Sequence, residues 1–101
     1  MSALNVYVTD GVIVEEHVVF SLADLCRACD AAPEQLLELV SEGLLEPQGS
    51  SPDEWRFSGS ALLRTRTAMR LAGDLALSPA GVALVMDLLD EIASLRARLR
   101  S

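Results

Sequence analysis

The sequence predicts a mainly α-helical fold that carries short β-hairpin elements and ends in a long C-terminal helix. Apolar residues recur at helical spacing in four stretches, three of which start at serines: Ser21, Ser58-Gly59-Ser60 and Ser78. Valines flank the pair Asp10-Gly11, which favours a two-residue hairpin turn. Hydrophobic residues make up 50% of the 101-residue chain, and this share and length suit one domain, residues 1–101, with one core.

Residues 1–19 are expected to form an extended segment that contains the hairpin. The β-branched residues beside the turn pair are Val6, Val8, Val12 and Val14. Residues of this type favour strands, and Asp-Gly is a strong signal for a tight turn between them. The segment from His17 to Phe20 then leads into the first helix.

Residues 20–58 are predicted to hold two helices and a β-wing. Ser21 with Asp24 three places on is a capping-box pattern, in which each side chain satisfies a backbone N–H at the start of the first helix. This helix is expected to stop near residues 30–32. Pro33 suits the first turn of the second helix, because the N–H that proline lacks is not needed there. Gly43 is expected to end that helix as a left-handed C-cap. The apolar positions of the two helices are Leu22, Leu25, Cys26, Cys29, Leu36, Leu37, Leu39 and Val40.

The wing is predicted where the pieces "LLEP" and "EWRF" bracket "QGSSPD". Two short extended pieces around a loop of Gly, Ser, Pro and Asp favour a hairpin-like wing. Residues 59–101 are then expected to form a helical pair. The third helix runs from about Ser60 to Asp74, and the fourth is capped by Ser78 and begins at Pro79. Two short helices, a wing and a further helix together define a winged helix-turn-helix.

The fourth helix has two apolar faces. One consists of Val82, Met86, Leu89 and Ala93. The other has the 3-4-3-4 spacing of a heptad seam and consists of Val85, Leu88, Ile92, Leu95 and Leu99. A helix that is apolar on both sides needs cover on both sides, so we expect the seam to form a homodimer interface. The alternatives are that both faces bury within one monomer, or that the helix frays after Ala93.

The charge of the chain bears on its partners. Fifteen acidic residues against eight basic ones, all of them Arg, give a formal net charge of −7. Nucleic-acid-binding proteins are normally basic, because neutralised phosphates and released counterions supply much of their affinity. Direct nucleic-acid binding is therefore not expected, and the acidic balance favours a partner with a basic face or serves solubility alone.

Two acidic groups are candidates for binding such a partner. Glu34, Glu38 and Glu42 recur every four residues and therefore form one stripe along the second helix, which we call the acidic stripe. Like charges at this spacing mildly destabilise a helix, so three in a row require a reason. The second group is Asp87, Asp90 and Glu91 on the fourth helix. The alternative is that both groups are simply solvated surface.

No catalytic, metal or cofactor site is predicted, and the chain is not expected to be an enzyme. Cys26 and Cys29 form C-x-x-C, but no second such pair and only one histidine are present, so a zinc site within one chain is not expected. The cysteines are assigned to packing. No apolar run approaches the roughly 20 residues of a membrane span, and residues 1–5 lack the basic region of a signal peptide. A cytoplasmic location is therefore expected.

The order of capped helix, turn, helix, "EGLLEP", wing, "WRF" and serine-capped helix resembles the N-terminal half of a MerR-type transcription regulator. Members of that family have an Arg-Tyr pair in the second helix for contacts with the DNA backbone. Aligned on "GLLEP", this pair falls on Leu37 and Glu38, so both contact side chains are absent. The wing keeps the family pattern, with Arg56 between two aromatic residues. The scaffold is similar and the DNA-reading chemistry is mostly missing.

A narrower resemblance covers about Phe20 to Leu95. The stretches "VSEGLLEP", "PDEWRF" and "RLAGDLALSPAGVALVMDLLDEIASL" are similar to those of the chaperone modulator CbpM family. The resemblance implies a protein without catalytic activity that binds the J-domain of CbpA, a DnaJ-like co-chaperone, and blocks its access to DnaK. J-domains present a basic helix to DnaK, and an acidic protein is electrostatically complementary to that helix. The segment before His17 is longer than the resemblance leads us to expect.

Two other functions remain open on the sequence. One is a MerR-like DNA-binding regulator, whose candidate contact residues near the wing are Arg56, Arg64, Arg66 and Arg70. The other is a dimerisation module without a regulatory site.

Overall fold

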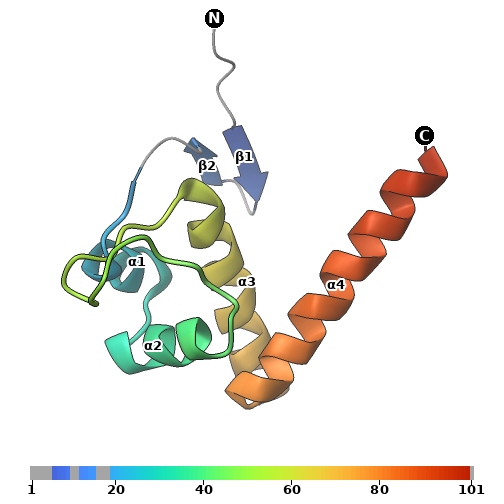
Figure 1. Ribbon diagram of the computed structural model, residues 1–101. Coiled ribbons are helices and arrows are strands. Elements are labelled where there is room, and N and C mark those ends of the chain that lie inside the picture. The colour runs from blue at the N-terminus through green and yellow to red at the C-terminus, as the bar shows by residue number, and fades with distance from the viewer. Residues whose placement is uncertain (1–5, 10–11, 16–18, 101) are drawn as a thin grey trace, which may run out of the picture.

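The computed structural model describes residues 6–9, 12–15 and 19–100. The elements are β1 (Val6–Thr9), β2 (Val12–Glu15), α1 (Leu22–Cys29), α2 (Pro33–Ser41), α3 (Gly59–Leu75) and α4 (Pro79–Arg100). α3 is the central helix, with α1 packed against it and the hairpin beside it, and α4 leaves the end of α3 as a long arm (Figure 1). The predicted mainly α-helical architecture is confirmed.

The N-terminal strands pair as the sequence predicts. β1 and β2 are antiparallel, and their register runs from Val6 opposite Glu15 to Thr9 opposite Val12. This register leaves two residues between the strands, the length expected for a tight hairpin loop. The turn pair Asp10-Gly11 itself lies outside the described residues.

α1 begins with the predicted capping box. The backbone N–H of Asp24 donates to Oγ of Ser21 at 3.1 Å, and the backbone N–H of Ser21 donates to a carboxylate oxygen of Asp24 at 3.0 Å. The bond from the backbone N–H of Ser21 is the main cause that holds the pKa of the Asp24 carboxyl below its usual range. Its stabilisation is therefore present above the unfolded-state pKa of Asp24 and is lost as the pH falls through the lowered, folded-state value. The helix ends at Asp30, which adopts a left-handed conformation with φ of 51°.

Replacing Ser21 by Ala is expected to lower the free energy of unfolding by about 1 kcal/mol, because the N–H of Asp24 loses its acceptor. Urea unfolding followed by circular dichroism measures this change. Ser94→Ala is the matched control, since Ser94 lies exposed in the middle of α4 and caps no helix. Equal stability of the two variants would show that the box contributes nothing.

α2 begins at Pro33, as predicted, and ends in a Schellman motif. The N–H of Leu44 donates to the carbonyl of Leu39 at 2.9 Å, and that of Gly43 to the carbonyl of Val40 at 3.0 Å. Gly43 has φ of 79°, a left-handed conformation that glycine adopts without strain. Leu39 and Leu44 are both buried, so this motif also directs the chain after α2 back into the core.

The predicted wing consists of isolated bridges rather than long strands. Gln48 and Arg56 exchange two backbone hydrogen bonds, of 3.0 and 2.8 Å, and Phe57 pairs in the same way with Phe20 before α1. Gly49 has φ of 123°, and a Cβ at this position would lie 2.8 Å from the carbonyl oxygen of Glu54. The wing turn therefore requires glycine here.

The core lies between α1, α2, α3 and the first turns of α4. Its buried apolar residues are Leu25, Leu36, Leu39, Leu44, Leu45, Phe57, Ala61, Leu62, Ala68, Val82 and Met86. Thr65 is buried with them, and its hydroxyl donates to the carbonyl of Ala61 at 2.7 Å. α3 extends one residue further at each end than the sequence predicts. Trp55 is half-buried and packs edge-on against Phe57 with ring centroids 6.0 Å apart.

α4 divides into a packed first part and an exposed second part. The side chain of Ser78 accepts a hydrogen bond from the N–H of Gly81 at 3.2 Å, which confirms the predicted cap. Val82 and Met86 are buried against the core, whereas every residue from Asp87 to Arg100 is exposed. The helix continues to Arg100, so the alternative that it frays after Ala93 is wrong. None of the described helices combines the length and apolarity that crossing a membrane requires.

Candidate protein-interaction surface

The acidic stripe is fully accessible. Glu34 and Glu38 lie on α2 and Glu42 is its C-cap residue, and all three are exposed. Within residues 19–100, Arg27–Asp24 and Arg64–Asp90 form ion pairs, and neither includes a carboxylate of the stripe. The stripe can therefore offer its charge to a basic partner.

The three acids of α4 do not behave alike. The guanidinium of Arg64 on α3 lies 3.3 Å from the carboxylate of Asp90, and its Nε donates to the carbonyl of Leu44 at 3.1 Å. Arg64 thus ties α4 to the chain segment that follows α2. Because the pair is largely exposed, its contribution to stability is at most about 1 kcal/mol. Asp87 and Glu91 are exposed.

The predicted dimer seam lies on the surface of the single chain. Leu88 is 54% exposed, Ile92 and Leu95 are each 45% exposed, and Leu99 is 86% exposed, whereas Val85 is half-buried. The alternative in which this face packs within the monomer is therefore wrong. Contiguous exposed apolar surface of this kind is typical of an interaction site.

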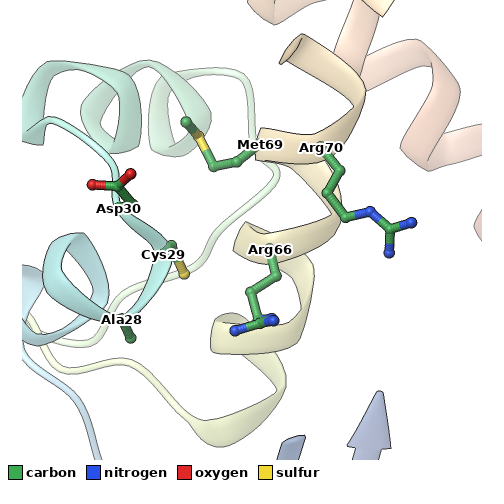
Figure 2. A pocket seen from close by; sticks show the side chains of 6 residues that line it. All are labelled: Ala28, Cys29, Asp30, Arg66, Met69 and Arg70. Atoms are coloured by element: carbon green, nitrogen blue, oxygen red, sulfur yellow. The ribbon is translucent and has the colours of Figure 1, made fainter. Parts of the chain in front are cut away.

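One hollow lies between the end of α1 and α3 and has a volume of about 400 Å³. Figure 2 shows the thiol of Cys29 and the guanidinium of Arg66 pointing toward one another there, while Arg70 points away along the other side of α3. The Nε of Arg66 is buried and has no hydrogen-bond partner among the described residues. The charged residues that line this hollow are Asp30, Arg66 and Arg70, so cations outnumber carboxylates and the hollow suits a basic partner poorly.

The two cysteines have protonated, packed thiols. Both are half-buried and free of disulfides, and burial raises the pKa of each thiol above its usual value. At Cys29 the positive charge of Arg66 partly offsets this effect, whereas at Cys26 the negative charge of Glu34 adds to it. A thiol with a raised pKa is a poor nucleophile and metal ligand. In the described part of the chain, no group of three or more His, Cys, Asp or Glu residues is placed to hold a metal ion.

A second hollow, which we call the α2–α4 groove, adjoins the acidic stripe. It has a volume of about 230 Å³ and lies where α2, α3 and the start of α4 meet. Buried Leu39, Ala68 and Val82 form its floor. The remaining lining residues are Gln35, Glu38, Met69, Ala72, Leu77 and Pro79. The groove is thus apolar inside and has one acid of the stripe on its rim. Sequence reasoning missed it, because its residues come from three elements and share no local pattern.

The four arginines proposed for DNA contact do not all share one surface. Arg66 and Arg70 both line the hollow between α1 and α3, whereas Arg64 faces α4 through Asp90. Arg56 is exposed on the wing, where its guanidinium donates to the carbonyl of Trp55 at 2.8 Å. At the two positions of the DNA-contacting pair, Leu37 and Glu38 are exposed but carry no cation. A phosphate backbone would therefore meet scattered cations and an acidic α2.

The two short helices, the wing and the long fourth helix define a protein of the MerR helix-turn-helix class. Residues 20–101 match the model of the MerR HTH family regulatory proteins. A chaperone modulatory protein CbpM from Coxiella burnetii is 36% identical over 91 residues, which cover 90% of this chain and 86% of the relative. A CbpM from Pseudomonas putida is 38% identical over 80 residues, which cover 79% of each chain.

The chain belongs to the CbpM family of chaperone modulatory proteins. The resemblance inferred from the sequence stretches is thereby confirmed. The match to the MerR family model begins at Phe20, after the hairpin, whereas the 91 residues matched by the Coxiella relative reach into the hairpin segment.

Proposed function

We propose that the protein is a non-catalytic chaperone modulator that acts in the cytoplasm. It binds the J-domain of a CbpA-type co-chaperone and inhibits the activity of that co-chaperone with DnaK. The observation that carries the proposal is the accessible acidic stripe, on the same helix in which this chain has Leu37 and Glu38 at the positions of the DNA-contacting Arg-Tyr pair. The relatives named as chaperone modulatory proteins support the same role.

Electrostatics explains how a DNA-reading scaffold serves a protein partner. Carboxylates on α2 repel phosphates and attract a basic helix. The same negative charges therefore disfavour DNA and favour a basic protein partner. The charge on the stripe also raises the rate of encounter with a basic J-domain, because opposite fields steer the two molecules together. Asp87 and Glu91 on α4 are further exposed acids.

The proposal is tested by the ATPase activity of DnaK. The co-chaperone stimulates this activity, and the protein is expected to reduce the stimulation in proportion to its concentration while leaving the basal DnaK rate unchanged. Unaltered stimulation at a large excess of the protein would contradict the proposed function. A loss of the basal rate would indicate action on DnaK itself and would equally contradict it.

Homodimerisation through the exposed seam is the second part of the proposal. The seam comprises Val85, Leu88, Ile92, Leu95 and Leu99, and all of these except the half-buried Val85 are exposed. Its heptad spacing fits the packing of a second α4 against it. A dimer would present two acidic stripes, one from each protomer.

DNA binding is expected to be weak and unspecific. The charges on α2 are all acidic, and Arg64 faces Asp90 rather than the hollow that Arg66 and Arg70 line. In gel-shift experiments at physiological salt, no sequence-dependent complex should form at submicromolar protein. A specific shift whose affinity falls steeply with salt would instead support the DNA-binding regulator.

A further inference from the structure

The acidic stripe by itself does not account for a stable complex. Charges at the rim of an interface mainly speed association, and exposed ion pairs contribute at most about 1 kcal/mol each. Stable interfaces depend on a few large side chains that fill a desolvated pocket near the centre. A docking site on this protein therefore needs an apolar recess beside the stripe.

The α2–α4 groove is such a recess. Glu38 belongs both to the stripe and to the rim of the groove, so the two features are continuous. The volume of about 230 Å³ lies below the roughly 300–1,000 Å³ of typical small-molecule sites, which favours an inserted side chain over a metabolite. Met69 in the wall has a flexible, unbranched side chain that can adapt to the shape of an inserted group.

The geometry points to a basic amphipathic helix as the occupant. We propose that one apolar side chain of this helix enters the α2–α4 groove while cations one turn away on the same helix pair with Glu38 and Glu34. Side chains three and four apart share a helical face, so one face can present both the anchor and the charges. This inference rests on the proposed function and assigns the J-domain's basic helix to a defined place on the surface.

Two further hollows in the described part of the chain fit this occupant less well. Asp30, Arg66 and Arg70 line the hollow between α1 and α3, so its cations outnumber its one carboxylate (Figure 2). The third hollow lies along α3 and combines Arg70 with Asp74, so its charges nearly cancel. The α2–α4 groove combines an apolar floor with an acidic rim and carries no basic residue.

Filling the groove tests the inference. Ala72→Phe places a ring in the recess, and Ala23→Phe adds the same ring to an exposed position of α1. Calorimetry with the isolated J-domain of the cognate co-chaperone should show a dissociation constant raised on the order of tenfold for Ala72→Phe. The slope of affinity against salt should remain unchanged, because no charge is altered. Ala23→Phe should bind like the unaltered chain.

The outcomes separate the inference from the function on which it rests. If the unaltered chain binds the J-domain and folded Ala72→Phe binds equally well, the groove is not the docking site although the function stands. If the unaltered chain does not bind, both are overturned. If circular dichroism shows that Ala72→Phe does not fold, a second experiment tests the inference. In it, each apolar side chain on the J-domain's basic helix is replaced by alanine in turn, and binding to the unaltered chain is measured. The inference predicts that at least one of these replacements weakens binding on the order of tenfold. If no replacement has this effect, the inference is contradicted.

Discussion

Reversing the charge of the acidic stripe is expected to weaken J-domain binding by at least about tenfold, equivalent to about 1.4 kcal/mol. The variant is Glu34→Lys, Glu38→Lys and Glu42→Lys together. Three exposed carboxylates become three cations that face a basic helix, so attraction turns into repulsion at the rim of the interface. The slower association should account for most of the loss, and higher salt should reduce the difference from the unaltered chain.

A matched triple variant separates local from overall charge. Asp53→Lys, Glu54→Lys and Asp74→Lys change the net charge by the same amount, but these exposed residues lie on the wing and near the end of α3. This control should bind much more tightly than the stripe variant. Glu34 in the first turn of α2 also interacts favourably with the helix dipole, so circular dichroism must confirm that the helix remains folded. If the two triple variants bind alike, only the overall charge matters and the stripe is a solvated face.

The second large effect is expected from Ile92→Glu, which should convert the proposed dimer into monomers. Ile92 is the central residue of the exposed seam. In a dimer it would place one carboxylate from each protomer in an apolar interface, and each unpaired charge costs several kcal/mol to bury. Sedimentation velocity at tens of micromolar (about the range in which a weak interface still forms) should show dimers for the unaltered chain and monomers for the variant.

Ser94→Glu is the matched control for the seam. It adds the same charge to the same exposed helix two residues further on, and side chains at that spacing do not share a face. It should remain dimeric. An unaltered chain that sediments as a monomer would contradict the dimer, and dissociation caused equally by both variants would show that charge on α4, rather than the seam, controls assembly.

Local features of the fold were predictable from the sequence. The capping box of Ser21, the proline start of α2 and the left-handed Gly43 depend on neighbouring residues, and the structure contains all three. The hairpin register follows from the Asp-Gly pair in the same way. The membership of the CbpM family also followed from the joint spacing of short stretches.

Features that depend on tertiary contacts were not predictable. Arg64 was a candidate for DNA contact, yet it bonds Leu44, 20 residues away, and Asp90, 26 residues away. No sequence period indicates a contact between residues so far apart. For the same reason Asp90 was grouped with the freely exposed acids, and the α2–α4 groove was not anticipated. The pairing of Glu38 with an apolar recess emerges only once α2, α3 and α4 are placed together.

Titration of the protein with two fragments of the cognate co-chaperone tests the central claim most directly. One fragment is the isolated J-domain, and the other is the co-chaperone with the J-domain removed. The account predicts that calorimetry detects binding to the J-domain alone, with affinity that falls as salt rises, and no binding to the remainder. Binding to the fragment that lacks the J-domain, or no binding to either, would contradict the assignment of this acidic surface to a J-domain partner.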